Sequence, residues 1–370
     1  MGPEIAEMGL SLLAALVSGL AQTLAITGVV LTNPVGAFKA ADQMLQQQAV
    51  PAAQTQIEDR QSPPLFELPP PFELNPQATQ SPPPQPKPSG PSYPPVTPLP
   101  DTPVPQGMGR LKECHYPQGK GERYIPLSAG TIKNCTKLPA EEVAQAAAKG
   151  LPFQIEPGSS QPQVLIMHTH TTESYEPGGR SWFDPEYTSR STDGTIGVPA
   201  VGAQIAARLN QAGIYTIQDV TLHDYPSYNG SYGRSHKTVT EYLQKYPSIK
   251  VVLDIHRDAI ETNGQRVSAV ADINGQKAAQ IMIICGADKN GNLPDFKKNL
   301  GFAAAFQAKA EEMFPGLTRP VLFDYRYYNQ DLTTGSLLVE VGSHGNTVQE
   351  AVYSGQLLGE TLAALFTGEG

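Results

Sequence analysis

The segment Val164–Tyr175, VLIMHTHTTESY, decides the fold, because an uninterrupted apolar run passes directly into a cluster of His, Thr and Glu. Two later segments have the same form, namely Val251–Ala259 (VVLDIHRDA) and Ser336–Asn346 (SLLVEVGSHGN). Short apolar runs of this kind are typical of strands buried on both faces. Because ligands collect at the carboxyl ends of strands in α/β sheets, the three polar clusters predict a single site.

Strands and helices are expected to alternate around these segments. The helix expected over Val198–Gly213 has Pro199 near its first turn and Gly213 past its end, as helices often do. Further strands are expected over residues 214–220, 267–274 and 280–286, and further helices over residues 141–150, 235–247, 299–314 and 347–366. This alternation predicts an α/β fold with a twisted, mostly parallel or mixed sheet and helices on both faces.

The charge balance and the cysteines exclude several classes of protein. The 370 residues have a formal net charge of −9, so the clustered basic excess that binds phosphates is missing, and we expect no nucleic-acid partner. Three cysteines are too few and too far apart for a zinc knuckle or a disulfide framework. Cys114 and Cys135 either pair or remain free thiols, while Cys285 lies in an apolar run typical of a core.

The N-terminal residues 1–38 predict a membrane anchor. No residue from Met8 to Phe38 is charged, and this apolar stretch is longer than the roughly 20 residues that span a bilayer. A cleaved signal peptide is the alternative, with a small-residue cleavage site near Val35. The preceding residues contain Glu4 and Glu7 but no Lys or Arg, so the positive-inside rule gives little support for the orientation.

Residues 39–108 predict a Pro-rich spacer. Eighteen of the 35 prolines lie between Pro63 and Pro105, and proline both removes amide donors and restricts φ. Such a stretch forms no core and behaves as an extended tether. The chain therefore reads as a single-pass membrane protein whose globular part is extracytoplasmic, with an N-terminal extension over residues 109–161 and a catalytic domain over residues 162–370.

Two histidines and a carboxylate in the polar clusters have the spacing of a metal site. His170 and Glu173 are three residues apart after the first predicted strand, so both can converge on one ion, and His256 supplies a second imidazole from another strand. Two His ligands, one carboxylate and an open fourth position are typical of hydrolytic zinc. His168 is an alternative to His170, because the two share a face if the strand continues through both.

Two further acids and a histidine complete the set of candidates. Asp254 lies on the same strand face as His256, where it either orients a metal-bound histidine or pairs with Arg257. Glu340 has apolar neighbours, and because burial raises the pKa of a carboxyl group, it suits a general base. A structural salt bridge is the alternative for Glu340. His344 is a candidate for substrate contact or proton transfer.

Three segments resemble a known family: HTHTTESY (168–175), DIHRDA (254–259) and YNQDLTTGSLLVEVGSHGNTVQEA (328–351). They are similar to the stage II sporulation protein P family of endospore formers, which is related to zinc-dependent N-acetylmuramoyl-L-alanine amidases. The resemblance covers roughly Cys114 to the end of the chain. It implies an amidase-like fold, one catalytic Zn²⁺ and cleavage of peptidoglycan stem peptides during engulfment, by amidase and also endopeptidase activity. It further implies a place at the forespore septum in the mother cell and a lytic transglycosylase partner.

Carried over by motif, His170 and His256 are zinc ligands and Glu340 is the catalytic residue. The related amidases place another ligand Glu before the helix that follows the first loop, where this chain has Asp193 and no Glu. The third ligand is therefore Glu173 or Asp193, and Glu173 is favoured because it is the longer carboxylate and lies close to His170.

The predicted function is a zinc-dependent peptidoglycan hydrolase in which Glu340 accepts the proton of the attacking water. Arg257 and Arg326 are candidates for binding stem-peptide carboxylates, with structural ion pairs as the alternative. A function of another class stays open, that of a catalytically inactive, membrane-tethered cell-wall binding or scaffold protein. The intact set of His170, His256 and Glu340 argues against it, and the zinc content of the purified protein would distinguish the two.

Overall fold

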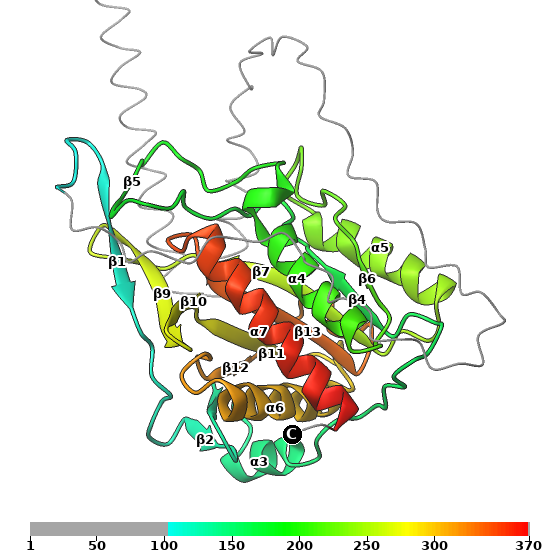
Figure 1. Ribbon diagram of the computed structural model, residues 1–370. Coiled ribbons are helices and arrows are strands. Elements are labelled where there is room, and N and C mark those ends of the chain that lie inside the picture. The colour runs from blue at the N-terminus through cyan, green and yellow to red at the C-terminus, as the bar shows by residue number, and fades with distance from the viewer. Residues whose placement is uncertain (1–102, 369–370) are drawn as a thin grey trace, which may run out of the picture. The chain divides into compact units, whose positions relative to one another are not determined.

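The computed structural model describes residues 103–368 (Figure 1). The predicted anchor over residues 1–38 and nearly all of the predicted spacer over residues 39–108 lie outside these described residues. Within residues 103–368, no helix has both the length and the apolar character needed to cross a bilayer. The membrane anchor therefore remains a prediction from the sequence.

The larger of two sheets carries the three segments that the sequence singles out. Within the described residues it has eight strands, in the order β2 (Tyr124–Pro126), β3 (Thr131–Asn134), β12 (Val321–Asp324), β11 (Ile281–Gly286), β13 (Gly335–Ser343), β7 (Val251–Asp258), β4 (Val164–Met167) and β6 (Thr216–Gln218). The neighbours are parallel except for the pairs β2–β3 and β11–β13. The prediction of a mostly parallel or mixed sheet is confirmed.

Strand β4 shows why these apolar runs form central strands. Its four residues are all buried, and their side chains alternate between two hydrophobic clusters. Val164 and Ile166 belong to the large core cluster, whereas Leu165 and Met167 belong to a smaller cluster on the other side. Because both faces of the strand are covered, no position along it favours a polar residue until the strand ends.

Helices cover both faces of this sheet, as expected. Three long helices contribute to the large core cluster: α4 (Val198–Gln211), α6 (Phe296–Met313) and α7 (Val348–Thr367). Figure 1 shows them crossing the front of the strands, with the short α3 (Ala140–Ala147) beside α6. Helix α5 (Ser231–Lys245) packs with the smaller cluster through Val239.

The helix boundaries follow local signals. Helix α7 begins with a capping box in which Thr347 and Glu350 satisfy each other's backbone N–H groups. Helix α5 begins four residues before the predicted start, directly after Gly230, whose φ of 81° is a left-handed value that favours glycine. The other long helices begin and end within three residues of the predicted positions.

Within the described residues, a second and smaller sheet has five strands. It contains β10 (Gln276–Ala279), β9 (Gln265–Ile273), β1 (Gly109–Cys114) and β5 (Trp182–Phe183), and β8 (Glu261–Thr262) pairs with β9. The predicted extension over residues 109–161 thus supplies β1 to this sheet, and β2 and β3 to the larger one. Strands β1, β2 and β3 are short and largely half-exposed, and they lack the apolar runs by which β4, β7 and β13 can be predicted.

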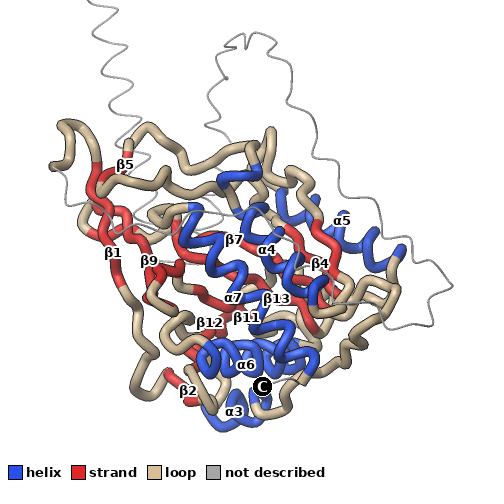
Figure 2. Tube along the Cα trace, viewed as in Figure 1, coloured by secondary structure: helices blue, strands red, loops and turns tan. Residues whose placement is uncertain are grey.

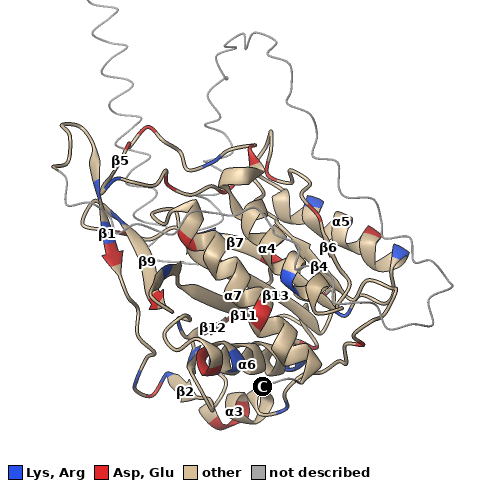
Figure 3. Cartoon of the chain, in the orientation of Figure 1, with Lys and Arg blue, Asp and Glu red and all other residues tan. Residues whose placement is uncertain are grey.

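Charged residues are rare on the central strands of the larger sheet in the view of Figure 3. Figure 2 shows the strands of the larger sheet behind α4, α6 and α7, and Figure 3 shows those central strands mostly without Lys, Arg, Asp or Glu in this view. The exceptions on β7 and β13 are therefore informative. Adjacent parallel strands place Glu340 of β13 directly across from His256 of β7.

Candidate active site

Five of the predicted site residues converge near the ends of β4, β7 and β13, namely His170, Glu173, Asp254, His256 and Glu340. Met167, the last residue of β4, pairs with Asp254, and His256 pairs with Glu340. Because directly paired residues in a sheet point to the same face, the side chains of His256 and Glu340 lie side by side. The chain that leaves β4 then brings His170 and Glu173 over these strands.

Asp254 and His256 form a buried pair on β7. His256 Nε2 lies 2.8 Å from Asp254 Oδ1, and Asp254 also accepts hydrogen bonds from the backbone N–H and the hydroxyl of Thr169. Burial alone would lower the pKa of His256, but the carboxylates of Asp254 and Glu173 raise it well above the ordinary value. Asp254 therefore fixes the orientation of the imidazole rather than pairing with Arg257.

Glu173 faces the other nitrogen of the same imidazole. Its Oε2 lies 3.4 Å from His256 Nδ1 and accepts a hydrogen bond from the backbone N–H of Arg257. Its Oε1 lies 3.6 Å from Arg190 and 3.7 Å from Arg257. Burial would raise the pKa of Glu173, but His256 and then Arg257 hold it at about 2, so the carboxylate is ionised.

His170 lies against His256 and two tyrosines. The His170 and His256 ring centroids are 5.1 Å apart in an edge-to-face arrangement, and Tyr228 stacks on His170 with its Oη 3.1 Å from Nε2. The Nδ1 atom is buried and has no hydrogen-bond partner among the described residues; the nearest carboxylate oxygen, on Asp224, is 4.0 Å away. Burial and the charge of His256 lower the pKa of His170 to about 4, so its imidazole is neutral.

His168, the alternative to His170, is turned away from this cluster. Its Nδ1 is 2.9 Å from the carbonyl oxygen of Ile255, and its Nε2 is 3.0 Å from Gln218. A Cβ atom at Gly202 of α4 would lie only 2.8 Å from the same ring, so His168 is packed between the sheet and α4. Burial lowers its pKa to about 4. His168 is a core residue in this structure.

Glu340 is the isolated acid of the site. Its Oε2 is buried and has no hydrogen-bond partner among residues 103–368, and its strand neighbours are His256 and Met282. Burial raises the pKa of Glu340 to about 8, and the charge of His256 opposes part of that rise. A carboxylate with a pKa near the working pH and a free lone pair is suited to accept a proton.

The remaining predicted residues lie in different environments. Asp193 is exposed and its carboxylate accepts hydrogen bonds from Thr195, at the start of a 3₁₀ turn (Gly194–Ile196). Arg326 is exposed and contacts Asp324 and Tyr328. His344 lies 3.2 Å from Glu261, and burial lowers its pKa.

Arg257 holds the loop that carries Glu173. Its Nε donates to the carbonyl oxygen of Ser174 and its Nη2 to that of Ser189, in addition to the contact with Glu173. The guanidinium is buried, so these contacts leave it little freedom to reach a substrate carboxylate.

Sequence reasoning missed several neighbours of the predicted residues. Asp224 accepts hydrogen bonds from Arg190 and Thr172, which ties the loop before α5 to the loop after β4. Asp258, two residues after His256, accepts a hydrogen bond from Arg319. No local pattern marks these residues, because their partners are 34 or more positions away in the chain.

The donor types present fit a zinc ion. Among residues 103–368, no three His, Cys, Asp or Glu side chains already form a group that would hold a metal. The orphaned Nδ1 of His170, the two imidazoles in contact and the ionised Glu173 are nevertheless the N and O donors that zinc takes. Asp254 on the far nitrogen of His256 is the outer carboxylate that usually orients a ligating histidine.

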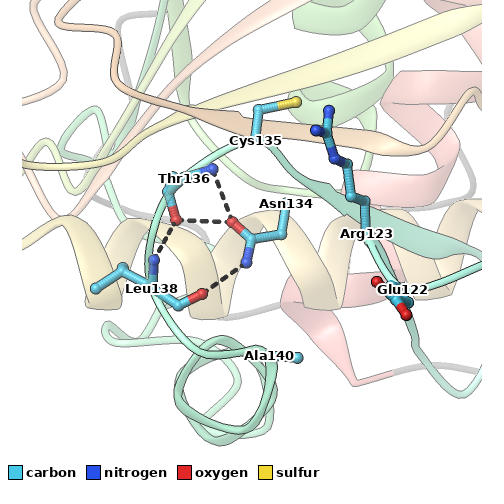
Figure 4. Close-up of a pocket in the computed structure, with 7 residues that line it drawn as sticks. All are labelled: Glu122, Arg123, Asn134, Cys135, Thr136, Leu138 and Ala140. Carbon is cyan, nitrogen blue, oxygen red and sulfur yellow. Dashed lines mark hydrogen bonds between the residues drawn. The ribbon is translucent and has the colours of Figure 1, made fainter.

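A pocket of about 310 Å³ lies away from these residues (Figure 4). It is lined by residues just before β2, at the end of β3 and at the start of α3, and includes none of the predicted site residues. Thr136 donates hydrogen bonds to the side-chain oxygen of Asn134 in the wall of this pocket. Cys135 is a free, half-buried thiol. Cys114, at the end of β1, is also free in this structure.

The comparisons with known proteins bear on this site. The family model of stage II sporulation protein P matches residues 123–363, which include every residue of the cluster described above. The chain belongs to the stage II sporulation protein P family. The predicted resemblance is thereby confirmed.

One curated member of the stage II sporulation protein P family is 29% identical over 198 residues, namely stage II sporulation protein P of Bacillus subtilis (strain 168). That match covers 50% of this chain and 47% of the relative, so the chain spans about half the length of the curated relative it matches.

Two solved structures similar to this chain are amidases. The first is an N-acetylmuramoyl-L-alanine amidase of Nostoc punctiforme, at 13% identity, covering 57% of this chain and 98% of that one with a TM-score of 0.33. The second is the CwlD amidase of Clostridioides difficile in complex with the GerS lipoprotein, at 15% identity, covering 56% and 95% with a TM-score of 0.33.

Proposed function

We propose that this chain is a zinc-dependent peptidoglycan hydrolase that acts as an N-acetylmuramoyl-L-alanine amidase in the cell wall during sporulation. The observation that carries the proposal is the cluster of buried His170, Glu173 and His256 with half-buried Glu340, near the ends of adjacent strands, in a member of the stage II sporulation protein P family. The proposal includes the membrane tether and the extracytoplasmic site expected from residues 1–108.

In this proposal His170, Glu173 and His256 hold the zinc ion. When bound, zinc supplies Lewis acidity, which lowers the pKa of water and polarises an amide carbonyl. Asp254 keeps the ring of His256 in one orientation through its contact with Nε2. Burial would raise the pKa of Asp254, but the charge of His256, and then the hydrogen bonds from Thr169, lower it and keep the carboxylate ionised. Arg190 and Arg257 compensate the charge of Glu173 and hold its loop on β7.

Glu340 moves the proton. It accepts the proton of the attacking water at the unpartnered Oε2 and returns it to the leaving amine of the stem peptide. The raised pKa of this carboxyl group suits both steps, because neither protonation state is strongly favoured near neutral pH. The predicted second activity, that of an endopeptidase, would use the same groups on a peptide bond further along the stem.

The fragments that the full-length protein releases from purified peptidoglycan test the function. Mass spectrometry is expected to find intact stem peptides that begin with a free L-alanine amine, together with glycan strands stripped of peptide. Shortened peptides still linked to muramic acid would identify an endopeptidase instead. Unchanged peptidoglycan, with wall binding retained, would support the alternative of a catalytically inactive binding or scaffold protein.

The choice between Glu173 and Asp193 as third ligand gives a separate prediction. Glu173→Ala should lower zinc affinity by more than about 100-fold, because a lost ligand costs more than the roughly 10- to 100-fold cost of an outer-shell change. Asp193→Ala should leave zinc affinity close to that of the wild type, since Asp193 is exposed and bonded to Thr195. Equilibrium zinc titration of both variants checks this, and a larger loss at Asp193 would transfer the ligand to that position.

A further inference from the structure

Three tyrosines are unusually exposed on two loops that flank the site. Tyr225 and Tyr228 lie in the loop between β6 and α5, with exposed fractions of 56% and 53%, and Tyr327 lies in the loop between β12 and β13, with 42%. The free energy of a large aromatic ring is normally lower when its apolar surface is buried than when it faces water. Exposed aromatic rings on loops that flank one site are typical of a surface that binds a ligand.

These loops reach the catalytic cluster through a chain of stacked rings. Tyr228 stacks on His170 with ring centroids 4.5 Å apart. Tyr328, the residue after Tyr327, packs on Tyr232 at 5.4 Å, and Tyr232 is parallel to His256 at 6.5 Å. We call Tyr225, Tyr228 and Tyr327 the tyrosine rim. Within the rim, Tyr228 contacts the imidazole of His170 directly. Tyr225 follows Asp224, and Tyr327 precedes Tyr328, in the same two loops.

Hydrogen bonds hold both loops in place. Asn329 donates hydrogen bonds to the carbonyl oxygen of Tyr232 and to the hydroxyl of Ser235, which joins the loop after β12 to α5. Tyr328 and Asn329 have φ values of 46° and 55°, a conformation that costs non-glycine residues energy and persists only where contacts hold it. Arg234 donates to the carbonyl oxygens of Ser227 and Asn229 in the other loop.

Tyr327 is also held at its hydroxyl end. Partial burial and a hydrogen bond with Asp331 raise the pKa of Tyr327 to about 12. A contact at its edge therefore orients the ring, while 42% of the residue remains exposed. A surface arranged before binding loses little conformational entropy when a ligand arrives.

We infer that the tyrosine rim binds a sugar ring of the glycan strand. A hexose ring has an apolar C–H face that stacks on an aromatic face, while its edge hydroxyls meet polar groups such as the exposed guanidinium of Arg326. This inference rests on the proposed function and deepens it. A sugar bound at the rim places a sugar-linked amide at the site, so the rim favours the muramoyl-L-alanine bond over a peptide bond further along the stem.

The test separates sugar binding from catalysis. Full-length protein carrying Glu340→Gln, which is expected not to turn over substrate, is titrated by calorimetry with a peptide-free N-acetylglucosamine oligomer and, separately, with a free stem peptide. Tyr327→Ala and Tyr225→Ala in this background should each weaken oligomer binding by about 2- to 10-fold, the worth of an aromatic contact, and should leave stem-peptide binding unchanged. Tyr327→Phe should retain the affinity, because it keeps the ring.

Tyr215→Ala is the matched control. Tyr215 is also exposed, at 37%, but it directly precedes β6 at the start of that strand, whereas the rim residues lie in the loops at the carboxyl ends of β6 and β12. Oligomer affinity that is unchanged in the rim variants, or lowered equally in Tyr215→Ala, would overturn the inference, as would a loss confined to the stem peptide. If the rim variants lose oligomer affinity and the wild-type protein hydrolyses nothing, the sugar site stands and the proposed function fails.

Discussion

Replacing Glu340 by Gln is expected to lower peptidoglycan hydrolysis by about 100- to 10,000-fold, the usual worth of a positioned acid–base group, while zinc stays bound. The amide keeps the size of the side chain but cannot accept the proton of the attacking water. Glu340 is not among the proposed zinc ligands and its Oε2 has no partner among the described residues, so no other contact is broken. Steady-state rates on purified peptidoglycan, with zinc content measured on the same samples, check this result.

A second glutamate provides the control for Glu340. Burial also raises the pKa of Glu350, but this residue belongs to the capping box at the start of α7. Glu350→Gln should leave turnover close to that of the wild type and change stability little, because glutamine also serves at this position of a capping box. A near wild-type rate for Glu340→Gln would make Glu340 structural and move the base to another acid of the cluster.

The pH dependence of stability gives an independent readout on Glu340. In the metal-free protein the folded chain keeps the Glu340 proton up to about pH 8, whereas the unfolded chain releases it near pH 4.5. The stability linked to this group is therefore complete below pH 4.5 and is lost as the pH rises to about 8. Glu340→Gln should melt with the wild type near pH 4.5 and about 2–8 °C higher near pH 8, the shift that roughly 1–2 kcal/mol produces.

Replacing either His170 or His256 by Ala is expected to abolish stoichiometric zinc binding and, with it, wall hydrolysis. The two variants should differ in stability. His170 is neutral and the one hydrogen-bond partner of its side chain among the described residues is an exposed tyrosine, so His170→Ala should fold with little loss. His256 lies between the ionised carboxylates of Glu173 and Asp254, and its removal leaves both less compensated. Breaking a buried ion pair costs about 3–5 kcal/mol.

Zinc content and thermal melting of the two variants check these expectations, with exposed His115→Ala as the control. Retention of a full equivalent of zinc in both variants would exclude His170 and His256 as ligands. Equal stability of the two variants would mean that the charge of His256 does not hold Glu173 and Asp254 in the folded state.

The sequence alone determined the central strands and the helices of this protein. The apolar runs that form β4, β7 and β13 are buried on both faces, so they stand out whatever surrounds them. The helix ends carry local signals such as the capping box of α7. Asp254 and His256 could be placed on one strand face, because side chains alternate along a strand. The strand pairing that brings Glu340 beside His256 was not predicted.

Only the tertiary structure decided which polar side chains meet. His168 and His170 are two residues apart, but β4 ends at Met167, so their rings pass to opposite sides, one against α4 and the other beside Tyr228. Arg257 binds the carbonyl oxygen of Ser189, and Asp224 pairs with Arg190, because loops that are distant in the sequence lie side by side. Such contacts depend on the path of the loops between strands and helices. No periodic pattern in the sequence predicts that path, because the polar groups of the loops bind residues that are far away in the sequence.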